Sequence, residues 1–199
     1  MTAVDDAAQI SDVGHRRDPH LPGDAGMWFF VLGDLIIFGG YFIIFMVYRS
    51  QNRALFLESQ QHLSKNVGVT NTLLLIASSW FVALGVQRVR AGAPERAVRL
   101  TMCGGLCGLL FIAVKAYEWS TELRRGFTFP HNDFFMFYYT LTGIHLGHVA
   151  LGLLILGIVI RHLRNPIGQH VAMAEIGATF WHMVDLLWIV IFALLYVMR

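Results

Sequence analysis

The chain has 199 residues, of which 56% are hydrophobic and only 14% are charged, and its formal net charge is +2. Soluble domains average about 45–50% apolar and about 25% charged residues, so this composition excludes an ordinary soluble domain and indicates a membrane protein. The small, scattered positive charge gives no reason to expect a nucleic-acid partner. Two cysteines, Cys103 and Cys107, lie in an apolar stretch and cannot build a disulfide framework.

Five stretches are apolar enough to cross a bilayer, which takes about 20 residues each. In chain order they are residues 27–48, 69–86, 97–119, 133–160 and 174–198. The sequence therefore predicts an all-α membrane domain, residues 27–199, built as a bundle of five transmembrane helices. The fourth stretch is longer than a span requires, so part of it should tilt or protrude. The polar connectors, including residues 49–68, are expected to be loops.

The segment before the first span is polar and lacks the basic and apolar regions of a signal peptide. The sequence therefore predicts that residues 1–26 form a flexible tail. Placing the N-terminus in the cytoplasm puts eight Lys and Arg residues on the cytoplasmic side and six on the other. The positive-inside rule favours this orientation by that small margin.

Ionisable side chains are costly at membrane depth, so those inside the spans should face the bundle interior and mark a site. They are Asp34, Lys115, Glu118, His145, His148, His182 and Asp185, with Glu175 near the start of the fifth span. Three pairs among them are spaced three residues apart, which puts both members of each pair on one helix face.

These spacings leave alternatives open. Lys115 and Glu118 could form an ion pair inside the membrane, or Glu118 could reach the interface beside Trp119. His182 and Asp185 could pair in the same way, with the carboxylate fixing the imidazole tautomer. For this second pair the sequence favours a structural role.

His145 and His148 also raise a metal or haem hypothesis, because imidazole is a common ligand of both. Such a site needs carboxylates or His182 to converge from other helices, whereas intramembrane His more often hydrogen-bonds across helices. The spacing of Cys103 and Cys107 occurs in binuclear copper centres, but the sequence offers no extramembrane domain with the remaining ligands. We expect the cysteines to pack on one helix face and the chain to hold no metal.

Two glycine pairs have the spacing that lets helices approach closely, Gly104 with Gly108 and Gly143 with Gly147. They predict either packing inside the bundle or a docking surface for a partner.

Four segments resemble, in order, the helices of one membrane-protein family. The segment EIGATFWHMVDLLWIVIFALLY (175–196) resembles the last helix of subunit III of haem–copper cytochrome oxidases. The segment FYYTLTGIHLGHVALG (137–152) resembles the Thr-Gly-x-His-x-x-His-Val helix of the same family. The segment KAYEW (115–119) is similar to the Glu-aromatic end of the preceding helix, and VTNTLLLIASS (69–79) to the Asn-Thr start of the one before. The resemblance extends over nearly the whole chain from Met27 onward.

The resemblance implies the five-helix form of this family and a non-catalytic subunit in a bacterial-type inner membrane. Such a subunit docks on subunit I, which with its partners holds the haem and copper, while this chain binds none. It holds phospholipid in a V-shaped cleft, supports proton uptake in aerobic electron transport and protects subunit I during turnover. The eight ionisable residues named above are then interpreted as a buried polar network and cleft lining.

One position departs from the family pattern. Where the first common helix usually carries Glu, MWFFVLGDLIIF (27–38) carries Asp34. This Gly-Asp version is similar to the accessory E protein encoded with nitric oxide reductases, so an accessory subunit on nitric oxide reductase catalytic subunits is the alternative. A free-standing membrane metalloenzyme using His and carboxylate ligands is more distant, and a transporter is disfavoured because no span contains a mid-membrane Pro.

Overall fold

The computed structural model describes residues 25–165 and 170–198. Its helices are α2 (Ala25–Gln51), α3 (Arg53–His62), α4 (Lys65–Arg90), α5 (Pro94–Arg124), α6 (Asp133–Leu163) and α7 (His170–Phe192), followed by the π-helix η1 (Ala193–Val197). No strand occurs within these residues. Residues 1–24 of the predicted tail lie outside the described part, and α2 begins at Ala25, inside the segment predicted as tail.

Five of the helices are long and apolar enough to cross a membrane, which confirms the predicted all-α bundle. The helices run past the predicted spans, and α4, for example, covers Lys65–Arg90 rather than residues 69–86. An apolar window marks only the part of a helix that lies in hydrocarbon, whereas the backbone stays helical through the polar residues beyond it. At 31 residues each, α5 and α6 are about 46 Å long, so both exceed a hydrocarbon core of about 30 Å.

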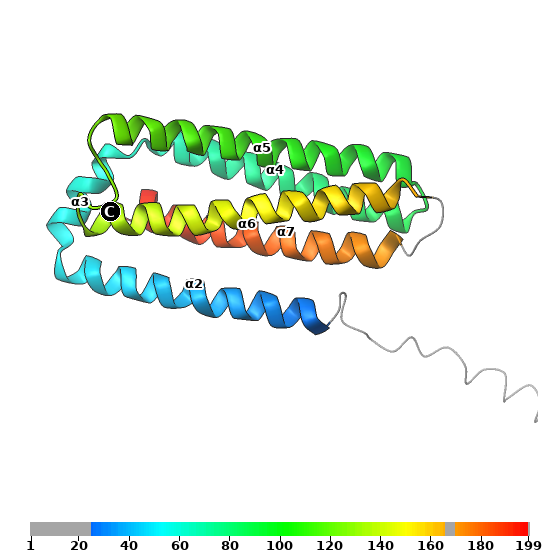
Figure 1. Ribbon diagram of the computed structural model, residues 1–199, viewed down its shortest axis with the longest axis horizontal. Helices are drawn as coiled ribbons and strands as arrows, with labels where there is room; N and C mark the ends of the chain where they lie inside the picture. Colours follow the sequence, from blue (N-terminus) through cyan, green and yellow to red (C-terminus); the bar gives the residue numbers. More distant parts are fainter. Residues whose placement is uncertain (1–24, 166–169, 199) are drawn as a thin grey trace, which may run out of the picture.

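The connector predicted as a loop, residues 49–68, instead contains helix α3 and the first turn of α4. Phe56 on α3 is fully buried, with its ring centroid 5.4 Å from that of Phe45 and 5.7 Å from that of Phe134. Gln60 Nε2 donates to the Leu194 carbonyl at 3.0 Å. Asn132 Nδ2 donates to Ser59 Oγ at 3.0 Å. A buried aromatic ring and two polar contacts thus hold α3 against one end of the bundle (Figure 1).

Helices α4 and α5 form a closely packed antiparallel hairpin. Their turn contains Gly92 at φ 69°, a left-handed conformation that glycine adopts without a steric penalty. A Cβ at Gly104 would lie 2.8 Å from Val82 Cγ2 and 3.1 Å from the Ser78 carbonyl, so the two helices can approach this closely only with glycine there. Ser78 Oγ donates to the Gly104 carbonyl at 2.7 Å across the same contact.

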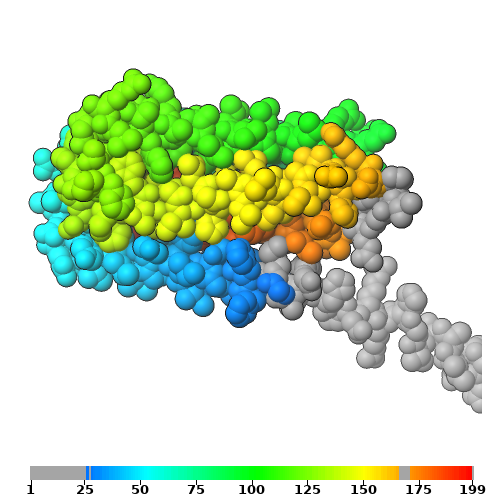
Figure 2. Space-filling view, viewed as in Figure 1, coloured from blue at the N-terminus to red at the C-terminus, as the bar shows by residue number. Residues whose placement is uncertain are grey.

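Helix α7 is the most deeply buried of the five spanning helices, and its Trp181 and Trp188 are fully enclosed. Helix α2 is the least buried and lies along one flank of the molecule (Figures 1 and 2). Its outward side chains include Phe29, Ile36 and Ile43, which are 82%, 75% and 68% exposed and recur every seven residues. An apolar stripe of this kind requires lipid or a protein partner rather than water.

Candidate functional site

The deepest polar cluster joins α5, α6 and η1 around Lys115. Its ammonium Nζ donates to Glu118 Oε2 at 2.8 Å, to the Tyr196 hydroxyl at 2.7 Å and to the Tyr138 hydroxyl at 3.3 Å. The Tyr196 hydroxyl in turn donates to Glu118 Oε1 at 2.6 Å. Each proton of the ammonium therefore has an acceptor, and both oxygens of the carboxylate have a donor.

This cluster answers the question that the sequence left open for Glu118. The side chains of Lys115 and Glu118 are 0% and 3% exposed, so the carboxylate stays inside the bundle instead of reaching the interface. The Lys115 Nζ also lies 4.6 Å from the Tyr138 ring centroid and 5.3 Å from that of Trp188. Aromatic faces attract a cation in a dry environment, so the rings add to the stabilisation that the carboxylate provides.

A second polar contact links α2 to α6. His148 Nε2 lies 3.2 Å from Asp34 Oδ2, and His148 Nδ1 lies 2.9 Å from the Ile144 carbonyl oxygen. A carbonyl only accepts, so Nδ1 carries a proton. The nitrogen–oxygen distance is that of an ion pair, although the approach falls short of hydrogen-bond geometry. Both side chains remain partly exposed, at 18% and 12%.

The predicted pair of His182 and Asp185 is not formed within the described residues. The two side chains share one face of α7, but both face α4, where Ser79 Oγ lies 2.5 Å from His182 Nδ1. The Ser79 hydroxyl also faces the Asp185 carboxylate, yet neither carboxylate oxygen has a hydrogen bond of ordinary geometry in the part of the chain described. These residues line a groove of ≈ 320 Å³ between α4 and α7.

His145 is fully buried on α6, and neither ring nitrogen has a hydrogen-bond partner among the residues described. Its ring centroid lies 5.7 Å from that of Phe111 and 5.2 Å from that of Trp188. The His145 ring therefore packs against aromatic side chains, and it takes no part in the hydrogen bonds of His148 and His182. Across residues 25–165 and 170–198, no three His, Cys, Asp or Glu side chains are placed to hold a metal ion together.

Glu175 is mostly buried, with a side chain 16% exposed, and lies at one end of the bundle. Its Oε1 accepts from Arg90 Nε at 3.0 Å and lies 2.8 Å from Arg90 Nη2. The arginine is 57% exposed, because both residues stand at the end of the bundle where α4 finishes and α7 begins. Glu175 thus fastens these two helix ends together.

The two glycine pairs have different surroundings. A Cβ at Gly108 would lie 2.7 Å from the Trp181 ring, so Gly108, like Gly104, makes room for a neighbouring helix. A Cβ at Gly143 would lie 3.4 Å from the Trp119 ring, an ordinary contact. Nothing lies within 4 Å of a Cβ at Gly147, so this exposed position contributes nothing to packing within the described chain.

The sequence indicated neither Tyr138 nor Tyr196 as a member of the Lys115 cluster. The hydrogen bond from Lys115 to Tyr196 joins residues 81 positions apart. The π-helix η1 widens the last turn after α7 and carries Tyr196 to the cluster, and such turns often mark functional positions. A tyrosine in an apolar helix is ordinarily interpreted as an interface anchor, so no sequence signal distinguished this one.

Taken together, the polar side chains at membrane depth occur as separate groups, and most of them bind one another. The arrangement can hold helices in register and keep charges inside a dry bundle.

Comparison with known proteins gives a match over most of the chain. Residues 22–199 match the family model described as "Cytochrome c oxidase subunit III". Cytochrome c oxidase subunit 3 of Thermostichus vulcanus is 31% identical over 179 residues, which cover 87% of this chain and 86% of the relative. The subunit of the same name from Synechocystis sp. is 31% identical over 189 residues, 93% of this chain and 79% of its own. Quinol oxidase subunit 3 of Bacillus spizizenii is 27% identical over 175 residues, 87% and 85% of the two chains.

Proposed function

Because the chain belongs to the cytochrome c oxidase subunit III family and is a subunit III of a haem–copper oxidase, we propose that it docks on catalytic subunit I and binds no haem or copper itself. As an oxidase subunit it forms a complex with other oxidase subunits, and its five apolar helices make it a multi-pass membrane protein. Its place is the inner membrane of a bacterial-type cell, with the N-terminus in the cytoplasm. The count of Lys and Arg residues, eight on the cytoplasmic side and six on the opposite side, supports that orientation.

The observation that carries the proposal is the satisfied cluster of Lys115, Glu118, Tyr138 and Tyr196. A fully bonded polar network in a low-dielectric interior rigidifies the helices that contribute to it. The Lys115 ammonium donates all three protons within the cluster, and each Glu118 oxygen has a donor there, so the ion pair suits a scaffold role better than a catalytic one. A rigid bundle with an apolar exterior gives a catalytic partner a fixed surface to dock against.

The Asp34–His148 contact supports a role in lipid binding and proton uptake. It lies on the inner side of α2, whose outer stripe of Phe29, Ile36 and Ile43 is free to face phospholipid or a partner helix. An imidazole beside a carboxylate, both partly exposed, is the combination of side chains that proton pathways in membrane proteins use. We assign to this contact the support of proton uptake into subunit I and to the face of α2 the retention of phospholipid.

An affinity tag on this chain tests the proposal in the organism's own membranes. Solubilised in mild detergent, the tagged chain should bring down a haem–copper catalytic subunit, identified by mass spectrometry and haem absorbance, and the eluate should consume oxygen. Recovery of the chain without any such subunit would overturn the proposal. Recovery of a complex that reduces nitric oxide but not oxygen would instead favour the accessory role on a nitric oxide reductase.

Deletion of the chain gives the second test. Oxidase that lacks it should start at a normal rate and then lose activity during turnover, since subunit III is proposed to sustain proton uptake. Equal lifetimes with and without the chain would contradict that part of the proposal and leave the docking role standing.

A further inference from the structure

The groove of ≈ 320 Å³ between α4 and α7 presents a free ring nitrogen to the outside of the bundle. His182 Nδ1 lies 2.5 Å from Ser79 Oγ, whereas His182 Nε2 has no hydrogen-bond partner among the described residues. The His182 side chain is partly exposed, and Nε2 is not among the enclosed polar atoms of the described chain. This nitrogen can therefore form one hydrogen bond with a molecule from outside the chain.

The groove lies at a depth that lipid headgroups do not reach. His182 stands near the middle of Val171–Val197 and Ser79 near the middle of Lys65–Arg90, two stretches long and apolar enough to cross a membrane. With a hydrocarbon core of about 30 Å, the middle of a span is about 15 Å from either surface. A molecule that bonds Nε2 must therefore carry an uncharged polar group that tolerates hydrocarbon, which excludes a phosphate.

The walls of the groove suit a flat, uncharged ring. Ile76, Leu186 and Ile189 supply apolar sides, and the Trp80 indole beside them is 61% exposed and offers a face for stacking. Asp185 lines the same groove, but both of its carboxyl oxygens are enclosed, so this group is not presented to an occupant. The volume of ≈ 320 Å³ falls at the lower end of small-molecule pockets, about 300–1,000 Å³.

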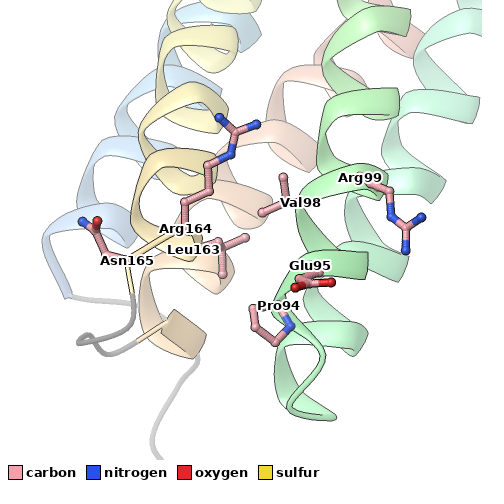
Figure 3. A pocket seen from close by; sticks show the side chains of 7 residues that line it. All are labelled: Pro94, Glu95, Val98, Arg99, Leu163, Arg164 and Asn165. Carbon is pink, nitrogen blue, oxygen red and sulfur yellow. The ribbon is translucent and has the colours of Figure 1, made fainter.

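The larger hollow at the end of the bundle lacks such a convergence of groups. It has a volume of ≈ 650 Å³ and lies between the start of α5 and the end of α6. Its charged side chains are those of Glu95, Arg99 and Arg164, and Figure 3 shows Arg99 turned away from Arg164. In the α4–α7 groove, by contrast, the free nitrogen and the exposed indole line one small space.

Quinones combine a flat, uncharged ring, oxygens on that ring and solubility in hydrocarbon. Their carbonyl oxygens need a hydrogen-bond donor, whereas the hydroxyls of the reduced quinol can donate to an acceptor. A neutral imidazole nitrogen donates in one tautomer and accepts in the other, so His182 Nε2 can serve either form. The Ser79 hydroxyl permits both tautomers, because it can donate to Nδ1 or accept from it.

We propose that the α4–α7 groove binds a membrane quinone in either redox form. The ring lies beside the Trp80 indole, one ring oxygen is hydrogen-bonded to His182 Nε2, and the apolar tail stays in the surrounding lipid. The proposal is one of binding alone and includes no electron transfer. It rests on the membrane location of the chain, and the docking role proposed above does not depend on it.

Photoreactive labelling of the full chain tests the site. The chain is purified in mild detergent and illuminated with an azido derivative of decylubiquinone, and the labelled peptides are mapped by mass spectrometry. The label should saturate and should concentrate on α4 and α7 around Trp80 and His182. Excess decylubiquinone, oxidised or reduced, should lower the labelling at least tenfold, whereas the same concentration of decanol should not.

Two variants separate the hydrogen bond from the shape of the groove. His182→Leu removes the nitrogen and should lower labelling at least tenfold, while His182→Gln keeps a side-chain donor and acceptor and should restore most of it. Ala83→Leu narrows the groove and should also lower labelling, whereas Ala113→Leu, at an exposed position of α5 outside the groove, should not. Each variant is labelled well below its melting temperature, so that lost labelling reports the site rather than unfolding.

Several results would overturn the proposal. They are label spread evenly over the outward helix faces, competition by decanol, wild-type labelling of His182→Leu or Ala83→Leu, and an equal loss in Ala113→Leu. The assembled complex supplies the last test, with Ile76→Cys in the groove wall carrying a thiol-directed cross-linker. Cross-linking to a helix of another subunit, together with loss of quinone labelling in the complex, would show that a protein covers the groove and would refute the quinone site.

Discussion

Replacing Lys115 by Met removes one charge from the most enclosed ion pair of the bundle. The Glu118 carboxylate, whose side chain is 3% exposed, would keep only the Tyr196 hydroxyl as a donor. Removing one partner of a buried pair costs about 3–5 kcal/mol, because the remaining charge is stranded away from water. At about 2–4 °C per kcal/mol for a chain of this size, the melting temperature should fall by about 6–20 °C. Far-UV circular dichroism of the detergent-solubilised chain measures it.

The chain contains its own matched control. Arg90 and Glu175 form an ion pair with the same nitrogen–oxygen distance of 2.8 Å, but the arginine is 57% exposed and the glutamate 16%. A pair that water reaches contributes about 0–1 kcal/mol, so Arg90→Met should lower the melting temperature by no more than about 4 °C. Combining Lys115→Met with Glu118→Gln should recover most of the lost stability, since no uncompensated charge remains. Equal losses at Lys115 and Arg90, or no recovery in the double variant, would refute the reasoning.

Three further outcomes are expected. His182→Leu and Ser79→Ala should each lower the free energy of unfolding by about 1 kcal/mol. Because both remove the same hydrogen bond, the double variant should lose no more than one single variant does. Additive losses in thermal melts would contradict this. Asp34→Ala should leave co-purification with the catalytic subunit intact but shorten the active lifetime of the complex, so unchanged decay of oxygen uptake would remove Asp34 from the proton-uptake proposal. Gly108→Leu should destabilise the chain by about 1–3 kcal/mol, because even its Cβ would lie 2.7 Å from a buried indole, while Gly147→Leu should melt like the wild type.

Features that depend on neighbouring residues were accessible from the sequence. Apolar windows located all five spanning helices, because each hydrocarbon crossing needs its own continuous apolar stretch. The ion pair of Lys115 and Glu118 followed as one possibility from a three-residue spacing on a single helix. The glycines at 104 and 108 predicted a close helix contact, although their spacing named neither Val82 nor Trp181 as the neighbour.

Features that depend on distant residues were not accessible. His182 and Asp185 share a face of α7, but that face packs against α4, where Ser79 hydrogen-bonds the imidazole of His182. Helix α3 was missed because it is too short and too polar to register as an apolar span, and its anchors Phe56 and Gln60 contact residues far away in the sequence. The pairing of Glu175 with Arg90 was missed because the α4–α7 contact that brings them together cannot be derived from a spacing within one helix.

The Lys115 cluster also orders the biogenesis of the bundle in time. Tyr196 is synthesised 78 residues after Glu118, so α5 and α6 enter the membrane before the hydroxyl that bridges the ammonium and the carboxylate exists. Until η1 follows α7 into place, Lys115 and Glu118 lack the hydroxyl that they share, so the last turn of the bundle completes the hydrogen bonding of its most buried ion pair.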